Sequence, residues 1–144
     1  MTKKFNNVIL SVLLLYASYC AISVGISWDE LAHIERGNER LKYILSFGTY
    51  DYIDYRDQKF YPGFYNTFVT FITKFFPKKY EIETLHITNF IFSISAIFGI
   101  SKIAKELFNK DVGKIVFVIC FFNPIFFGHM AINQKDMIIA FSNI

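Results

Sequence analysis

The hydrophobic pattern divides the chain into long apolar runs separated by short polar segments. The first run covers residues 8–26 without a charged side chain, and as a helix it would extend about 28 Å, close to the ~30 Å hydrocarbon core of a bilayer. Two further runs cover 85–104 and 115–127, and a fourth begins at Met137 and is cut off at Ile144. The pattern predicts an all-α membrane protein with about three transmembrane helices and the start of a fourth. We expect a single transmembrane domain over 1–144 that is truncated, or that relies on another element to complete it, because the last run is too short to span a bilayer.

Three details of these runs bear on the prediction. A cleaved signal peptide is the alternative for the first run, and we favour an uncleaved anchor because Tyr19 and Cys20 interrupt any small-x-small cleavage site. Pro124 interrupts the third run and predicts a kink or an end there. Asn109-Lys110-Asp111 predicts a short turn between the second and third runs.

The distribution of lysines predicts the topology. Lysines cluster before the first run and between Lys102 and Lys114, and lysine-rich ends mark the cytoplasmic side. The N-terminus is then cytoplasmic, and the outer loops are 27–84 and 128–136. The stretch 61–76 offers an alternative: if it crossed the membrane, every later loop would change sides. We favour amphipathic, interfacial or re-entrant helices in the large first loop, because this stretch is short for a span and begins with aromatic residues.

Composition supports a membrane protein and excludes several other classes. Apolar residues make up 53% of the chain and charged residues 19%, with 18 Phe and 9 Tyr, a balance that excludes disorder and fits a water-soluble domain poorly. A net charge of +3, scattered along the chain, excludes a nucleic-acid footprint. The two cysteines lie in apolar runs and form neither a disulfide framework nor a metal cluster. The many Phe, Ile, Asn and Lys residues are typical of an AT-rich bacterial genome, so we expect the bacterial inner membrane.

An acidic pair, Asp29-Glu30, directly follows the first run, and 29–47 is predicted to be a helix. At about 100° per residue, one face of that helix gathers a carboxylate, an imidazole and two guanidiniums within about 60°. These residues are Asp29, His33, Arg36 and Arg40. The alternative is an ordinary amphipathic surface helix with solvated charges. Gly37, in the middle, is expected to loosen the helix.

A second group of ionisable side chains lies between the third and fourth runs. His129, Lys135 and Asp136 are next to hydrocarbon, where such groups are costly and indicate function. The alternative is a simple polar turn at the membrane surface. Under the favoured topology Asp29 and Asp136 share the outer face, so the functional argument depends on that topology.

Four features follow one another along the chain: the acidic pair after the first run, Tyr61-Pro62-Gly63-Phe64-Tyr65 before an apolar stretch, a helix pair joined by a basic turn, and Asn123-Pro124 followed by Asn133-Gln134-Lys135-Asp136. This arrangement resembles the GT-C-fold glycosyltransferases, which include protein O-mannosyltransferases and the aminoarabinose transferases acting on lipid A. Gly63 stands where the family has a second proline. Because members have many more spans, the resemblance implies that this chain is the N-terminal portion of such an enzyme.

The resemblance implies an inverting transfer of a sugar from a polyprenyl-phosphate-linked donor to an acceptor hydroxyl at the extracytoplasmic face. Asp29 is then the expected catalytic base, and Glu30 is expected to orient the acceptor. Cations are expected to stabilise the leaving phosphate. The expected substrate-binding residues are His33, Arg36, Arg40, His129, Lys135 and Asp136. Asp136 is also the candidate ligand for a divalent metal ion, the one cofactor considered. The expected partners are the lipid-linked donor and the bilayer.

Two other functional classes compete with this hypothesis. The main alternative is a non-catalytic integral membrane protein, either an accessory subunit or a relic without transferase activity. A transporter fragment is weaker, because the spans hold no paired ionisable groups beyond His86 and Lys102.

Overall fold

The computed structural model describes residues 3–51 and 63–144, and within them every regular element is a helix. The helices are α1 (Lys3–Ser23), α2 (Glu30–Leu45), α3 (Phe64–Thr73), the 3-10 turn η2 (Lys78–Tyr80), α4 (Glu81–Leu107), α5 (Lys110–Phe122), α6 (Pro124–Ile132) and α7 (Asp136–Ser142). The predicted all-α class is confirmed for this part of the chain. Tyr61 and Pro62 of the Tyr-Pro-Gly-Phe-Tyr motif lie outside the described residues.

The prediction of three spans is not supported. Within the described ranges, the 30-residue stretch Lys78–Leu107 is the one helix long and apolar enough to cross a membrane. The apolar part of α1 covers Asn7–Ser23, and the chain leaves the helix there instead of continuing to residue 26. The third predicted run is divided into α5 and α6, which meet at a bend of 68° and together make at most one broken span.

The bend between α5 and α6 follows from the sequence Asn123-Pro124. Proline has no N–H to donate and is accommodated at the first turn of a helix. Asn123 is extended, with φ −64° and ψ 118°, and its side chain accepts a hydrogen bond from Phe126 N at 3.0 Å. It therefore ends α5 and caps α6, so the break predicted at Pro124 is confirmed.

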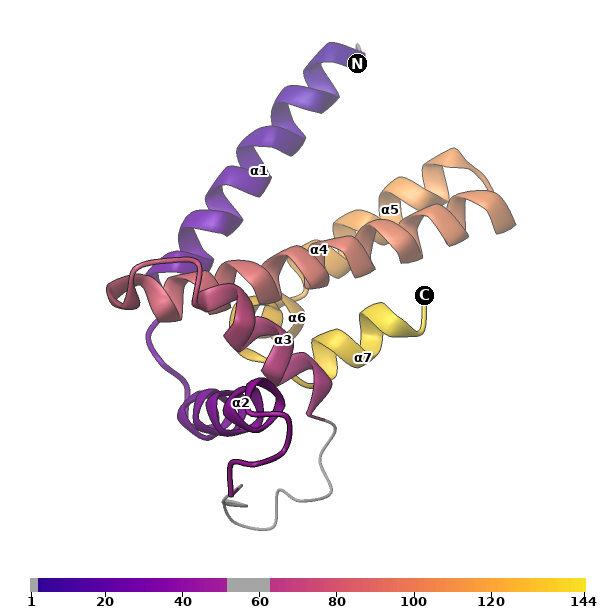
Figure 1. The fold of residues 1–144 in the computed structure, drawn as a ribbon. Coiled ribbons are helices and arrows are strands. Elements are labelled where there is room, and N and C mark those ends of the chain that lie inside the picture. The colour runs from indigo at the N-terminus through magenta and orange to yellow at the C-terminus, as the bar shows by residue number, and fades with distance from the viewer. Residues whose placement is uncertain (1–2, 52–62) are drawn as a thin grey trace.

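The longest helix, α4, forms an antiparallel hairpin with α5 (Figure 1). The turn lies at residues 108–109, where Asn109 Oδ1 accepts hydrogen bonds from Asp111 N and Val112 N at 3.0 Å each. This cap confirms a turn close to the predicted position. Gly113 allows close packing, since a Cβ there would lie 2.8 Å from the carbonyl oxygen of Ser101 on α4.

Apolar side chains of α1, α4, α5 and α6 form the core, which consists of Ala17, Ala21, Phe90, Ile94, Ile97, Phe121, Met130 and Ala131. Beside it, α4 carries three fully buried polar residues, His86, Asn89 and Ser93, which we call the α4 polar stripe. Asn89 Nδ2 donates to the Ala131 carbonyl at 2.7 Å, and Ser93 Oγ donates to the Met130 carbonyl at 2.9 Å. Asn89 and Ser93 of the stripe therefore connect α4 to α6 by hydrogen bonds.

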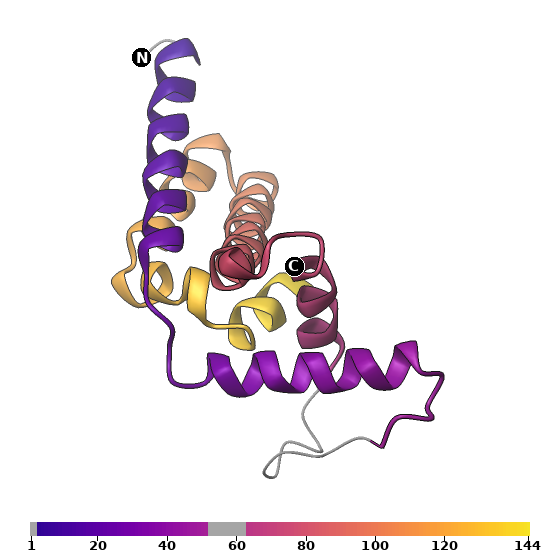
Figure 2. The same ribbon diagram turned by 60° about the vertical axis from the view of Figure 1, so that its left-hand side comes forward.

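The second helix lies crosswise to α1 at one end of the molecule (Figures 1 and 2). It packs against α3 at Gly37, where a Cβ would lie 2.7 Å from the carbonyl oxygen of Asn66 and would also overlap Thr70 Oγ1. Gly37 thus permits a close crossing of α2 and α3. In Figure 2, α7 lies between α2 and α4.

Candidate functional site

The two residues of the acidic pair after α1 differ in burial: Asp29 is exposed and Glu30 is buried. Asp29 is the N-cap residue of α2 and is exposed, with no hydrogen bond from its side chain to the helix end. Glu30 is 0% exposed. Its Oε1 lies 2.7 Å from His86 Nε2, and its Oε2 accepts from Ser27 N at 2.5 Å. Both carboxylate oxygens of Glu30 are therefore engaged within the protein.

The Glu30–His86 contact fixes the position of one proton. His86 Nδ1 lies 3.1 Å from the Ala21 carbonyl oxygen, which can only accept, so Nδ1–H donates to it. The Nε2 atom then either donates from an imidazolium to the Glu30 carboxylate or accepts from a protonated Glu30. In both arrangements the pair shares one proton and has no net charge. It joins the end of α1 and the start of α2 to α4.

A pocket of about 200 Å³ lies between α2, α3, α7 and the connection from α6 to α7. We call it the Arg36–Lys135 pocket. Its polar side chains come from these four segments and are His33, Arg36, Tyr65, Asn66, Gln134, Lys135 and Ser142, and the apolar side chains of Phe64, Ile138 and Ile139 complete the lining. The structure thus brings together three of the predicted site residues, His33, Arg36 and Lys135, from the two predicted outer loops.

The electrostatics of this pocket act on His33. Burial lowers the pKa of His33, and the positive charges of Arg36 and Lys135 lower it further, whereas Asp29 acts in the opposite direction. Asn66 Nδ2 lies 3.0 Å from His33 Nδ1, an amide donor facing a ring nitrogen that accepts. The neutral imidazole therefore keeps its proton on Nε2.

Two further groups give the pocket an excess of N–H donors. Gln134 is 5% exposed, and its Nε2 has no hydrogen-bond partner among the residues that the structure describes. The Arg36 side chain is also buried, at 4% exposure. Burying an amide without a partner costs free energy, so an acceptor in this pocket would be stabilised. Guanidinium, ammonium and amide groups together suit an anion such as phosphate.

Tyr65 forms the opposite wall. Its hydroxyl donates to Asn89 Oδ1, so the pocket is connected to the α4 polar stripe. Burial raises the pKa of Tyr65, and the hydroxyl therefore stays protonated.

Asp136 and His129, by contrast, belong to a different cluster. Asn133 Nδ2 donates to Asp136 Oδ2 at 3.0 Å and lies 3.1 Å from His129 Nδ1. Both side chains are exposed and line a separate open cavity of about 480 Å³ beside Cys120. Asp29 is not among the residues that line this cavity with Asp136. Within 3–51 and 63–144 no group of three or more His, Cys, Asp or Glu side chains is arranged to hold a metal ion.

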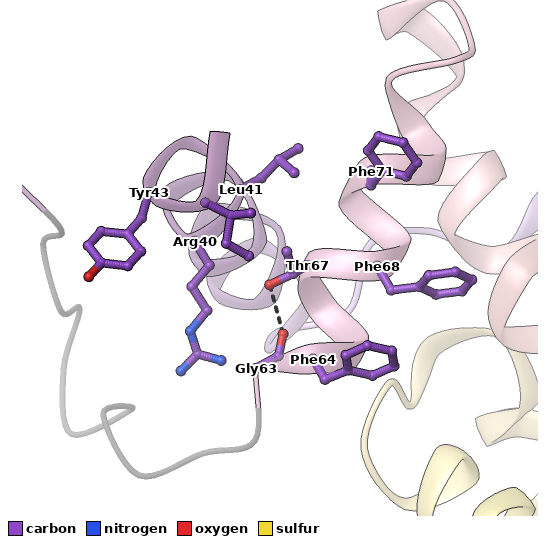
Figure 3. A pocket seen from close by; sticks show the side chains of 9 residues that line it. Arg40, Leu41, Tyr43, Gly63, Phe64, Thr67, Phe68 and Phe71 are labelled. Carbon is purple, nitrogen blue, oxygen red and sulfur yellow. Dashed lines mark hydrogen bonds between the residues drawn. The ribbon is translucent and has the colours of Figure 1, made fainter. Parts of the chain in front are cut away.

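Arg40 is one turn beyond Arg36 and faces another surface. It lines an apolar groove between α2 and α3 (Figure 3). A Cβ on Gly63 would overlap the Arg40 guanidinium, so a larger residue at 63 requires Arg40 to move. Gly63 thus lies directly against Arg40, a predicted site residue.

The burial of Glu30 and its link to His86 were not predicted. The sequence showed His86 only as an interruption of an apolar run, and no periodicity connects positions 30 and 86. No protein-family model matches the chain, and comparisons with curated proteins and with solved structures also find no match.

Proposed function

We propose that the chain is the N-terminal part of an inverting GT-C-type membrane glycosyltransferase whose Arg36–Lys135 pocket receives the phosphate of a polyprenyl-phosphate-linked sugar donor. One observation carries the proposal. Two cationic side chains and a buried, unpartnered amide from distant parts of the chain, Arg36, Lys135 and Gln134, line a single pocket. Such a donor set suits a phosphate better than a divalent cation, so Arg36 and Lys135 meet the charge of the leaving phosphate.

The roles of the other residues follow from their burial. Asp29 is exposed one turn before His33 and acts as the base, taking the proton of the acceptor hydroxyl. The acceptor oxygen attacks the anomeric carbon, and the bond to the phosphate oxygen breaks with its electron pair on the phosphate. Glu30 is enclosed by His86 and Ser27, so we assign it to positioning the start of α2 and not to contact with the acceptor. Neutral His33 offers its Nε2–H to the phosphate.

In this proposal α4 crosses the bacterial inner membrane with its N-terminal end outside. Lys102, Lys105, Lys110 and Lys114 then lie at the cytoplasmic end of the α4–α5 hairpin, in agreement with the positive-inside rule. The Arg36–Lys135 pocket lies beside the N-terminal half of α4, where its residue Tyr65 bonds to Asn89, and it therefore belongs to the extracytoplasmic half of α4 in this proposal.

Donor binding tests the pocket. Arg36→Gln and Lys135→Gln, each in the full chain in detergent, should weaken binding of a polyprenyl phosphate by about 10–100-fold, because a charge-assisted hydrogen bond contributes about 1.5–3 kcal/mol. Lys42→Gln is the matched control, since Lys42 is exposed on the same helix and pairs with Glu39 at 2.7 Å. Equal binding by the three variants and the parent would refute the phosphate pocket.

The catalytic role of Asp29 is tested by sugar transfer. In the full-length protein, Asp29→Asn should abolish transfer while membrane insertion is kept, and Asp51→Asn, which changes another exposed carboxylate of the same loop, should leave transfer unchanged. Transfer retained by Asp29→Asn removes it from the catalytic role. A full-length protein that binds polyprenyl phosphate but transfers no sugar would favour the alternative, a non-catalytic accessory protein.

A further inference from the structure

The groove next to Arg40 has mainly apolar walls. It has a volume of about 720 Å³ and lies between α2 and α3. Figure 3 shows Phe64, Phe68 and Phe71 at successive turns of α3, with Leu41 and Tyr43 on the α2 side. Side chains of both helices therefore give the groove a mainly apolar lining.

Aromatic side chains continue this surface beyond the groove. Phe64 is 83% exposed and Phe75 is 72% exposed, and the rings of Phe71 and Phe75 contact each other edge to face at 5.0 Å. So much exposed aromatic surface on adjacent turns is costly in water and marks a binding surface.

Positive charge lies where the aromatic surface meets the candidate span. Lys74, Lys78 and Lys79 are exposed, and Lys74 forms a 3.6 Å ion pair with Glu81. The stretch apolar enough to cross a membrane begins at Lys78. The chain connection thus puts these lysines and the end of the groove at the level of lipid headgroups.

We propose that the α2–α3 groove binds an anionic phospholipid of the surrounding leaflet. One acyl chain lies along Phe68 and Phe71, and the phosphate contacts Lys78 and Lys79. The apolar walls suit an acyl chain, and Arg40 in the groove together with the lysines at the start of the candidate span suits an anionic headgroup. The inference requires α4 to be in a membrane, but it does not depend on sugar transfer.

The experiment measures contact between the groove and lipid chains. Trp28 is the only tryptophan of the chain, so Trp28→Phe gives a background without indole emission. Phe71→Trp, or Phe75→Trp as a second site, then reports on the groove in bilayers of phosphatidylcholine and phosphatidylglycerol. Glu35→Trp is the control, because Glu35 is exposed and lies on the face of α2 opposite Ile44, which lines the groove.

Brominated acyl chains quench an indole that they touch. We expect quenching at positions 71 and 75 and none at 35, with brominated phosphatidylglycerol preferred over brominated phosphatidylcholine by about fivefold for each lysine within reach of the headgroup. Lys78→Gln with Lys79→Gln should remove the preference and keep the quenching. The proposal is overturned if bromination does not change the tryptophan emission at either site. It is also overturned if the emission depends only on the protein-to-lipid ratio, because that result indicates that a second copy of the chain occupies the groove. Equal quenching by both lipids overturns the headgroup contact.

Discussion

The Glu30–His86 pair makes a sharp prediction about stability. Replacing Glu30 by Ala leaves His86 Nε2 and the Ser27 N–H without partners in a site where both side chains are 0% exposed. Removing one partner of a fully buried pair costs about 3–5 kcal/mol. Glu30→Gln should cost less than about 1 kcal/mol, because its amide can donate to Nε2 of a neutral His86 while its oxygen still accepts from Ser27 N.

Reversible unfolding of the purified chain in mixed micelles, followed by circular dichroism, measures these free energies. A double-mutant cycle with His86→Ala isolates the coupling, which should fall between about 0.5 and 3 kcal/mol in favour of the pair. The reasoning is refuted if Glu30→Ala unfolds like the parent. It is also refuted if Glu30→Gln is as unstable as Glu30→Ala, since the charge and not the hydrogen-bond geometry would then matter.

Three further outcomes can be measured with the same chain. Gly37→Ala should destabilise by about 1–3 kcal/mol, because its Cβ would lie 2.7 Å from the Asn66 carbonyl oxygen; a neutral effect in urea unfolding would contradict the close crossing. Folding lowers the pKa of His33 below its ordinary value of 6.5. The contribution of neutral His33 to the free energy of unfolding is therefore complete above pH 6.5 and is lost as the pH falls through the pKa of the folded state. Phosphate in the pocket should raise this pKa, and an NMR titration showing no change would argue against anion binding there. Asn109→Ala should cost about 1 kcal/mol through loss of the α5 cap, and a thermal melt identical to the parent's would contradict it.

Local rules predicted the local structure well. The helix predicted for 29–47 is α2 over Glu30–Leu45, and the break at Pro124 occurs where the missing N–H requires it. The prediction of three spans is not supported, because hydropathy reports which residues are apolar and not where the backbone bends or leaves a helix. Residues 24–26 belong to the apolar run, yet the helix has ended by then, and the bend at Asn123 divides the third run.

The site was predicted only in part, for a geometric reason. A helical wheel puts His33, Arg36 and Arg40 on one face of α2, but α3 crosses that face at Gly37. Arg36 is left on the pocket side of the crossing and Arg40 on the groove side. Which side each arginine occupies depends on the partner helix, and a single-helix projection contains no information about it.

The α4 polar stripe has a consequence for biogenesis. Its three residues are spaced at three and four positions and so lie in a single row along an otherwise apolar helix. An α4 released alone into hydrocarbon would expose an imidazole, an amide and a hydroxyl to lipid, which is unfavourable until α1 and α6 supply their carbonyl oxygens. Since α6 is translated after α4, an α4 that crosses a membrane would have its polar stripe satisfied only once α6 has emerged, and insertion of the two helices together is the expected order in that case.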